Sequence, residues 1–236
     1  MSAANDPNRM ILSLVAHALG ELCDELVFVG GCATGLLVTS VRAQTVRVTE
    51  DVDLIAQVTS AQEYHAMEAR LASKGFKHDI SPGAPICRWR CKDIEVDLMP
   101  SGNNVLSFHN RWYPLAIETA GRVTVEEGLT IRLIAAPVFI GTKLEAFKGR
   151  GNNDFLLSHD LEDIISVLDG RAELVAELQA APLELRRYVA SEFGALLETP
   201  AFLDALAGHL PGDSVSQQRL PKLVERIRQV AKVTYP

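Results

Sequence analysis

The chain has 236 residues, of which 47% are hydrophobic and 22% charged, a composition typical of globular proteins and a length that suits one large domain or two small ones. The net charge of −7 and the pI near 5.4 argue against a protein that coats nucleic acid by bulk attraction, although they leave room for a local basic groove. The four cysteines form no disulfide-scaffold pattern, no signal peptide precedes them, and the longest apolar run is too short to span a bilayer, so we expect a cytoplasmic protein with no membrane partner.

The first part of the chain alternates between helical and strand spacing, and we expect an α/β core over residues 1–135. In chain order, the apolar pattern predicts a helix at 9–23, a strand at 25–31, a helix at 33–41, a strand at 51–58, a helix at 60–75, a β-hairpin at 84–100 and two strands at 122–126 and 129–134. Ser60 and Glu63 have the spacing of a capping box at the start of the second long helix.

The rest of the chain has helical spacing throughout, which predicts a helical domain over residues 136–236 packed against the core. Its helices are expected to begin near residues that favour a first turn or an N-cap: Pro137, Ser158, Pro182, Pro200 and Pro221.

Residues 48–58, VTEDVDLIAQV, form a predicted strand that carries two acids on one face. Side chains alternate across a strand, so Asp51 and Asp53 share one face while Val52 and Leu54 share the other. Like charges held two residues apart repel each other, and Asp is a poor strand former. The pair is therefore either two solvent-facing acids on an edge strand or part of a site that a cation stabilises.

A third acid, Asp97, lies in a second predicted strand with the sequence IEVDLMP. If the two strands are neighbours and these faces coincide, Asp51, Asp53 and Asp97 converge. Three ionised carboxylates in one place repel one another unless cations are bound. Oxygen ligands of this kind suit Mg²⁺ or Mn²⁺, and two such ions clamp the attacking and leaving oxygens of a phosphoryl-type transfer. The three acids therefore predict a metal site.

Two glycines stand before the acids, in FVGG at 28–31. There a strand ends and a helix begins, and the free backbone N–H groups of such a junction attract phosphate. In this interpretation Cys32 or Thr34 adds a further donor. The structural alternative for Gly30 and Gly31 is a tight turn with no ligand.

The order of strand, Gly-Gly, helix, strand with D-x-D and later strand with one Asp resembles the DNA polymerase β-like nucleotidyltransferase superfamily. In particular it resembles the AbiEii toxin family, the nucleotidyltransferase toxins of type IV toxin–antitoxin systems. The motifs that carry the resemblance are VGGCA at 29–33, TEDVDL at 49–54, IEVDL at 94–98, TKLEAFKGR at 142–150 and HDLEDI at 159–164. The C-terminal helices match in position and character only. The nineteen residues between Gly31 and Asp51 are a long spacer for the superfamily, and an extra loop around 42–48 would accommodate them.

The resemblance implies an α+β fold, in which a polymerase β-like core of mixed sheet and flanking helices precedes a C-terminal helical bundle. It implies that Asp51 and Asp53 bind two Mg²⁺ or Mn²⁺ ions together with the nucleotide phosphates. Asp97 would complete one metal site and help to activate an acceptor hydroxyl. Gly30 and Gly31 would hold the triphosphate of an NTP substrate through their backbone amides.

Two further positions follow from the same resemblance. Cys32 stands where family members often have Ser or Thr after the glycines, which changes one phosphate hydrogen bond. Lys143 would approach the nucleotide phosphates, with Asp160 supporting it. From its own apolar surroundings, a buried Lys143 ammonium would need an anionic partner. Asp163, in the first turn of the same predicted helix as Asp160, fits a structural role that the helix dipole favours.

Two other features remain open. His109 and Arg111 either border a nucleotide pocket, with Trp112 or Tyr113 stacking on a base, or belong to a loop anchored by an aromatic residue. Residues 215–236 hold five basic residues and one acid, an excess that suits either RNA phosphates or a solvated helix face.

The leading hypothesis is a metal-dependent nucleotidyltransferase that joins a nucleoside monophosphate from an NTP to an acceptor hydroxyl. The resemblance suggests a tRNA end, another RNA or a protein as acceptor, and a cognate antitoxin as partner. The alternatives are a small-molecule nucleotidyltransferase of the antibiotic-modifying kind, and a catalytically silent nucleotide-binding module.

Overall fold

The computed structural model describes residues 6–40 and 46–234. The described chain forms two compact units, named here the sheet unit (6–35 and 48–135) and the helical unit (36–40, 46–47 and 136–234). The extra loop expected around 42–48 falls largely on residues 41–45, which lie outside the described residues.

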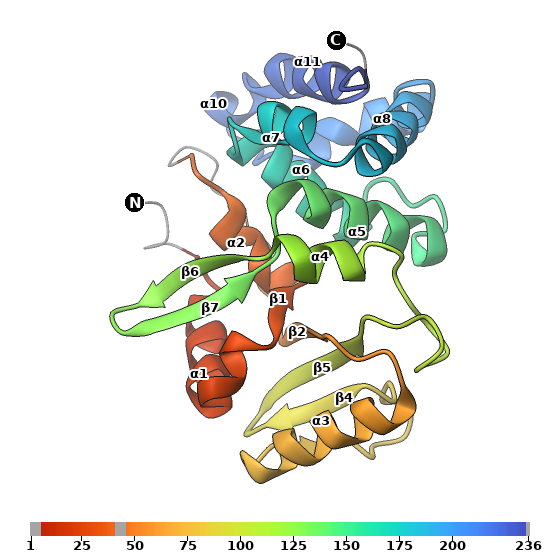
Figure 1. Cartoon of the computed structure of the whole chain (residues 1–236). Helices are drawn as coiled ribbons and strands as arrows, with labels where there is room; N and C mark the ends of the chain where they lie inside the picture. The colour runs from red at the N-terminus through yellow and green to blue at the C-terminus, as the bar shows by residue number, and fades with distance from the viewer. Residues whose placement is uncertain (1–5, 41–45, 235–236) are drawn as a thin grey trace. The chain divides into compact units, whose positions relative to one another are not determined.

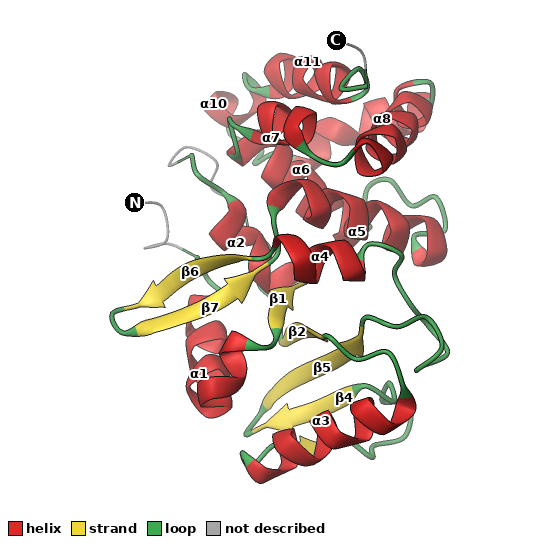
Figure 2. Cartoon of the chain, in the orientation of Figure 1, coloured by secondary structure: helices red, strands yellow, loops and turns green. Residues whose placement is uncertain are grey.

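Within the described residues, seven strands form the mixed sheet of the sheet unit (Figures 1 and 2). They are β1 (Val27–Val29), β2 (Asp51–Ala56), β3 (Lys77–His78), β4 (Arg88–Cys91), β5 (Ile94–Pro100), β6 (Gly121–Glu126) and β7 (Leu129–Leu133). Their order is β3-β4-β5-β2-β1-β7-β6. The pairs β2–β5 and β1–β7 are parallel, and the remaining neighbours are antiparallel.

Three α-helices lie entirely within the described part of this unit: α1 (Arg9–Leu19), α3 (Ala61–Ser73) and α4 (Tyr113–Thr119). The predicted capping box at the start of α3 is confirmed, because the Ser60 side chain accepts from the Glu63 amide while the Glu63 carboxylate accepts from the Ser60 amide. The buried face of α3 includes Tyr64, whose hydroxyl donates to the Leu98 carbonyl of β5 at 2.8 Å. This helix therefore covers the apolar face of the strands that carry the acids.

The helical unit contains the C-terminal helices (Figure 1). In the described residues they are α5 (Ala136–Arg150), α6 (His159–Gly170), α7 (Leu174–Ala180), α8 (Leu183–Leu197), α9 (Pro200–Ala205), α10 (Ser214–Gln217) and α11 (Leu220–Val230). The short segment 36–40 joins this unit, where the amides of Thr39 and Ser40 donate to the Gly170 carbonyl at the end of α6. No helix among the described residues is both long enough and apolar enough to cross a membrane.

The mixed sheet with flanking helices, followed by C-terminal helices, confirms the predicted fold class. The hairpin prediction is also confirmed, with Lys92 at a φ of 56° in its turn. The helix expected at 33–41 is wrong in length, because α2 spans only Thr34–Leu37. The two-residue strand β3 and the helix α4 were not expected, since each is too short to show a full period of apolar residues.

Candidate metal and nucleotide site

The strands β2, β5 and β4 have one charged face and one apolar face. The apolar face is buried and consists of Val52, Leu54, Trp89, Val96 and Leu98. The opposite face carries four acids from β2 and β5 and two arginines from β4: Asp51, Asp53, Glu95, Asp97, Arg88 and Arg90. A slip of one residue would turn these acids into the core and expose side chains whose burial contributes about 1.5–3 kcal/mol each. The apolar face therefore fixes the acids on the opposite side.

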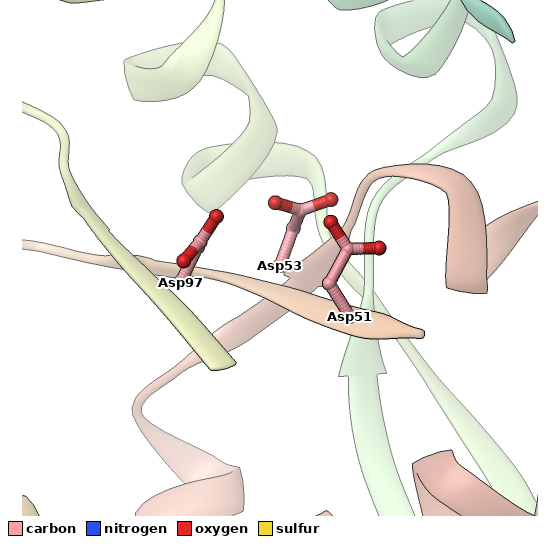
Figure 3. Close-up of side chains that lie close together, drawn as sticks. All are labelled: Asp51, Asp53 and Asp97. Atoms are coloured by element: carbon pink, nitrogen blue, oxygen red, sulfur yellow. The ribbon is translucent and has the colours of Figure 1, made fainter. Parts of the chain in front are cut away.

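The strand register brings the three predicted metal ligands together. Asp53 and Asp97 are direct partners in the parallel β2–β5 pair, and Asp51 lies two residues before Asp53 on the same face. One carboxylate oxygen from each residue lies within 4.8 Å of the others. Figure 3 shows the three side chains pointing to the same side of the two strands. The predicted convergence of the three acids is confirmed.

This donor set fits a divalent cation. Asp51 and Asp53 are half-buried and Asp97 is 8% exposed, so their charges are only partly solvated. Carboxylate oxygens are the ligands that Mg²⁺ and Mn²⁺ prefer, and one or two carboxylates plus substrate phosphates make the usual Mg²⁺ site. The residues present are therefore suitable ligands for the ions that the sequence resemblance implies.

Gly30 lies directly beside this cluster, at the end of β1. Val29 pairs with Asp53 across the β1–β2 ladder, so the next residue passes the Asp53 side chain. Gly30 has a φ of +70°, and a Cβ atom there would lie 2.7 Å from the Asp53 Cβ and overlap its carboxylate. Only glycine fits, for both its conformation and its lack of a side chain. The backbone thus approaches the acids more closely than any other residue type would allow.

The residues after Gly30 turn into a short 3₁₀ helix, Gly31–Ala33. Gly31 is buried there, and Cys32 is fully buried with its thiol donating to the Val29 carbonyl at 3.2 Å. The Thr34 side chain is fully buried as well. The Cys32 thiol is thus directed at the protein's own backbone. Phosphate binding by Gly30, Gly31 and Cys32 stays a prediction.

An arginine that the sequence motifs did not single out contacts one of the three acids. Arg88 lies opposite Asp97 in the β4–β5 ladder, and its Nε and Nη2 donate to the two Asp97 oxygens at 2.9 and 2.8 Å. Arg88 also pairs with Glu95, which in turn accepts from Arg90 at 2.9 Å. The Arg90 Nε also donates to an Asp79 carboxylate oxygen at 2.8 Å. Alternating charges thus run from the acid cluster to Asp79, the residue that follows the edge strand β3.

The contact between Arg88 and Asp97 could have been predicted from the hairpin turn. If Lys92 and Asp93 form the turn, Cys91 pairs with Ile94, and counting back three residues on one strand and forward three on the other places Arg88 opposite Asp97. The hydrogen bond with Asp97 and the neighbouring acids raise the pKa of Arg88, so its charge is permanent. Cys87 directly precedes β4 and is buried. Burial and the charge of Asp97 raise the pKa of its thiol to about 12.

Lys143 and Asp160 lie in the helical unit, on α5 and α6. Lys143 is 6% exposed, and its Nζ lies 3.2 Å from Asp160 and 2.6 Å from Asp163. Arg150 forms two 2.8 Å hydrogen bonds with Asp160, and Arg47 lies 3.6 Å from Asp163. The expectation that a buried Lys143 needs an anionic partner is confirmed. The roles predicted for Lys143 and Asp160 toward a nucleotide stay predictions.

Asp160 is ionised within this cluster. Burial by itself would raise its pKa, but the hydrogen bonds and charges of Arg150 and Lys143 outweigh burial and lower the pKa below the usual 3.8. Asp163 is 1% exposed and supplies the shorter contact to Lys143. The structural role expected for Asp163 is therefore that of a buried counter-ion.

Trp112 and Tyr113 were considered as side chains that could stack on a base, and both make contacts inside the protein. Trp112 is 3% exposed with the Arg111 guanidinium 5.0 Å from the centre of its ring, and the Tyr113 hydroxyl donates to the Met99 sulfur at 2.9 Å. The Trp112 ring is therefore packed inside the protein and is not open to a base. Trp112 therefore fits the alternative interpretation, an aromatic residue that anchors a loop, while roles of His109, Arg111 and Tyr113 toward a nucleotide stay predictions.

The basic residues near the C-terminus are largely used inside the helical unit. Arg219 pairs with Asp169 at 3.0 Å, and Arg226 donates to the Asp169 carbonyl at 3.1 Å. Arg228 lies 3.9 Å from Glu225. The contacts of Arg219 and Arg226 attach α11 to the end of α6, so these two basic residues have a structural use.

Comparison with known proteins finds similar solved structures at low identity. The antibiotic-resistance factor ANT(2'')-Ia matches with a TM-score of 0.46 and 15% identity, over 80% of this chain and 96% of that chain. JHP933 from Helicobacter pylori matches with a TM-score of 0.48 and 13% identity, over 94% and 91%. A provisionally named nucleotidyltransferase from H. pylori matches with a TM-score of 0.45 and 13% identity, over 94% of each chain. Because all three TM-scores lie below 0.5, this likeness does not by itself define the activity. No family model and no curated protein matches the chain.

Proposed function

We propose that this chain is a metal-dependent nucleotidyltransferase, which transfers a nucleoside monophosphate from an NTP to an acceptor hydroxyl. The observation that carries the proposal is the meeting of Asp51, Asp53 and Asp97 on one face of β2 and β5, within 4.8 Å of one another. Three acids that converge on two adjacent strands are costly for a sheet that has no cation to bind. A site for two Mg²⁺ or Mn²⁺ ions accounts for them.

Each of the chain's own groups has a defined task in this reaction. The acceptor oxygen forms a bond to the α-phosphorus of the NTP, the bond to the β-phosphate breaks, and pyrophosphate leaves. When bound, the metal ions neutralise the charge that develops on the oxygens around the α-phosphorus. Asp51 and Asp53 would hold ions and phosphates together. Asp97 would complete one ion site and help to activate the acceptor hydroxyl, whose proton passes to solvent as the new bond forms. Gly30 keeps the backbone close enough for its neighbouring amides to reach the triphosphate.

The acceptor class and the biological setting rest on the AbiEii resemblance. We propose an RNA acceptor, such as a tRNA 3′ end, or a protein hydroxyl, and a toxin that is paired with a cognate antitoxin. The charge of −7 makes bulk attraction of RNA weak, so an RNA acceptor would be held by local contacts near the site.

The test uses α-labelled nucleoside triphosphates, Mg²⁺, total RNA and the full chain. We expect label on RNA or on protein, and we expect Asp53→Asn to abolish it, because one ligand oxygen of the acid cluster is replaced by an amide. The matched control is Glu50→Gln, since Glu50 is an exposed acid next to Asp51 that lies outside the cluster. This variant should label at the wild-type rate.

Other outcomes distinguish the alternatives. Label that appears only on an added aminoglycoside panel would replace the RNA or protein acceptor with a small molecule. A wild-type chain that binds triphosphate but transfers no label to any acceptor would indicate a silent nucleotide-binding module. Normal labelling by Asp53→Asn would refute the proposed site.

A further inference from the structure

Among the described residues, Arg88 is a cation that contacts the acid cluster through Asp97. Its guanidinium donates to both oxygens of Asp97, while the side chains of Arg88 and Asp97 are only 19% and 12% exposed. A two-point contact of this kind fixes the plane and the rotamer of a carboxylate, which a single hydrogen bond does not. Each Asp97 oxygen therefore has one direction occupied by an N–H group before any ion arrives.

Arg88 is itself held by a second acid. Glu95 pairs with Arg88 and with Arg90, and Arg90 is anchored to Asp79, the residue that follows the edge strand β3. Hydrogen bonds from Ser81 and from Arg90 lower the pKa of Asp79 to about 2, so that this anchor is charged at neutral pH. The Arg88 guanidinium is thus held by Glu95 as well as by Asp97. It therefore has little freedom to move with Asp97 if the Asp97 side chain turns.

We propose that Arg88 is a positioning residue for Asp97, an inference that rests on the proposed function. It orients the carboxylate toward Asp51 and Asp53 and offsets part of the cluster's negative charge. Its two effects on a bound cation oppose each other. The fixed orientation favours the productive arrangement of Asp97, while the positive charge of Arg88 weakens the overall attraction for a divalent ion. A residue that only stabilised the fold would not separate affinity from rate in this way.

The experiment measures two quantities on the full chain: Mn²⁺ affinity without nucleotide, from the free-ion electron paramagnetic resonance signal, and the rate of label transfer at saturating Mn²⁺. Arg88→Gln should bind Mn²⁺ about threefold or more tightly, because a positive charge is removed. Its transfer rate should fall about ten- to a hundredfold, because Asp97 loses its orientation. Arg88→Lys keeps the positive charge but loses the two-point contact that a guanidinium makes with a carboxylate. Its Mn²⁺ affinity should therefore stay near wild type, while its transfer rate falls about tenfold.

The matched control is Arg70→Gln, which removes an arginine that makes the same kind of two-point contact with Glu25, an acid outside the cluster. Both of its quantities should stay near wild type. Weaker Mn²⁺ binding by Arg88→Gln, or an unchanged rate in both Arg88 variants, would overturn the inference. If Arg88→Gln does not fold, Arg88→Lys with wild-type rate would overturn it as well.

The proposed function and this inference fail in different ways. A wild-type chain that binds no Mn²⁺, or binds it as well after Asp53→Asn, would remove the metal site altogether. A wild-type chain that binds Mn²⁺ through Asp53, beside Arg88 variants indistinguishable from it, would remove only the role of Arg88. If no acceptor is labelled, no transfer rate can be measured and the Mn²⁺ affinities alone decide whether the inference holds. The inference then requires Arg88→Gln to bind Mn²⁺ more tightly than wild type and Arg88→Lys to bind it about as tightly as wild type.

Discussion

Gly30 shows how closely the site depends on one backbone position. Its φ of +70° is unfavourable for any residue with a Cβ atom, and its neighbour in space is the Asp53 carboxylate. A side chain at this position would therefore cost energy twice, once for the backbone conformation and once for displacing a metal ligand.

We predict that Gly30→Ala lowers the free energy of unfolding by about 2 to 5 kcal/mol, as the sum of backbone strain and overpacking. The control is Gly128→Ala in the β6–β7 turn, where φ is +79° and no atom lies within 4 Å of the added methyl group. That variant should lose only about 1 kcal/mol. Urea unfolding of both variants makes the comparison, together with Mn²⁺ binding, which only Gly30→Ala should impair. Equal losses in the two variants would show that the close approach to Asp53 is unimportant.

At the same scale, the acids could be predicted from sequence because strand alternation is local. The spacing of Asp51 and Asp53 places them on one face, and the apolar neighbours of Asp97 show which way it points. Neither pattern says which strands are neighbours, so the residues predicted convergence only on the condition that the two strands lie side by side, and the direct pairing of Asp53 with Asp97 was not predicted. The hydrogen bond from the Cys32 thiol to the Val29 carbonyl could not be predicted, since no local pattern in the sequence indicates it.

At the scale of elements, α5 and α6 are joined by a buried ion cluster around Lys143. Two acids from α6, Asp160 and Asp163, face the ammonium, and Arg150 reaches Asp160 from the end of α5. Removing one member of such a cluster leaves its partners incompletely compensated inside the protein.

We predict that Asp160→Asn lowers the free energy of unfolding by about 1–3 kcal/mol at pH 7. Because the pKa of Asp160 is lower in the folded chain than its usual 3.8, its stabilising effect is complete above that value and is lost as the pH falls through the folded pKa. The difference between wild type and variant should therefore shrink below about pH 4.

Urea unfolding between pH 3 and pH 7 measures this difference. The control is Glu162→Gln, an acid in the same first turn whose side chain is 38% exposed, and its effect should stay within about 0.5 kcal/mol at every pH. A wild-type advantage over Asp160→Asn that grows toward low pH would contradict the charged state assigned to Asp160.

Elements with a full period of apolar residues were predictable, and short ones were not. The capping box of α3 and the proline starts of α8, α9 and α11 follow local rules, so their positions agree with expectation. The length of α2 depends on the contacts of the segment that follows it. The Leu37 carbonyl accepts a hydrogen bond from Arg171, and the amides of Thr39 and Ser40 donate to the Gly170 carbonyl. Contacts between residues more than a hundred positions apart leave no periodic pattern in the sequence.

For the molecule as a whole, the acid cluster costs stability in the absence of a cation. Arg88 and Arg90 compensate part of the charge of the four acids on the β2–β5 face, and the remainder repels itself across the strands. Such a cost is expected where function, not folding, selects the residues.

We predict that Asp51→Asn is more stable than wild type in EDTA, by about 1 kcal/mol, because one like charge leaves the cluster. Excess Mg²⁺ should reverse the order. At about 100 times its dissociation constant, the ion should stabilise wild type by about 2.7 kcal/mol and the variant by much less. Urea unfolding with EDTA and with Mg²⁺ gives both values, and Glu50→Gln, an exposed acid just outside the cluster, should follow wild type in each buffer. If Mg²⁺ stabilises Asp51→Asn as much as wild type, the carboxylate of Asp51 is not a ligand, and the crowding of acids on this face needs another explanation.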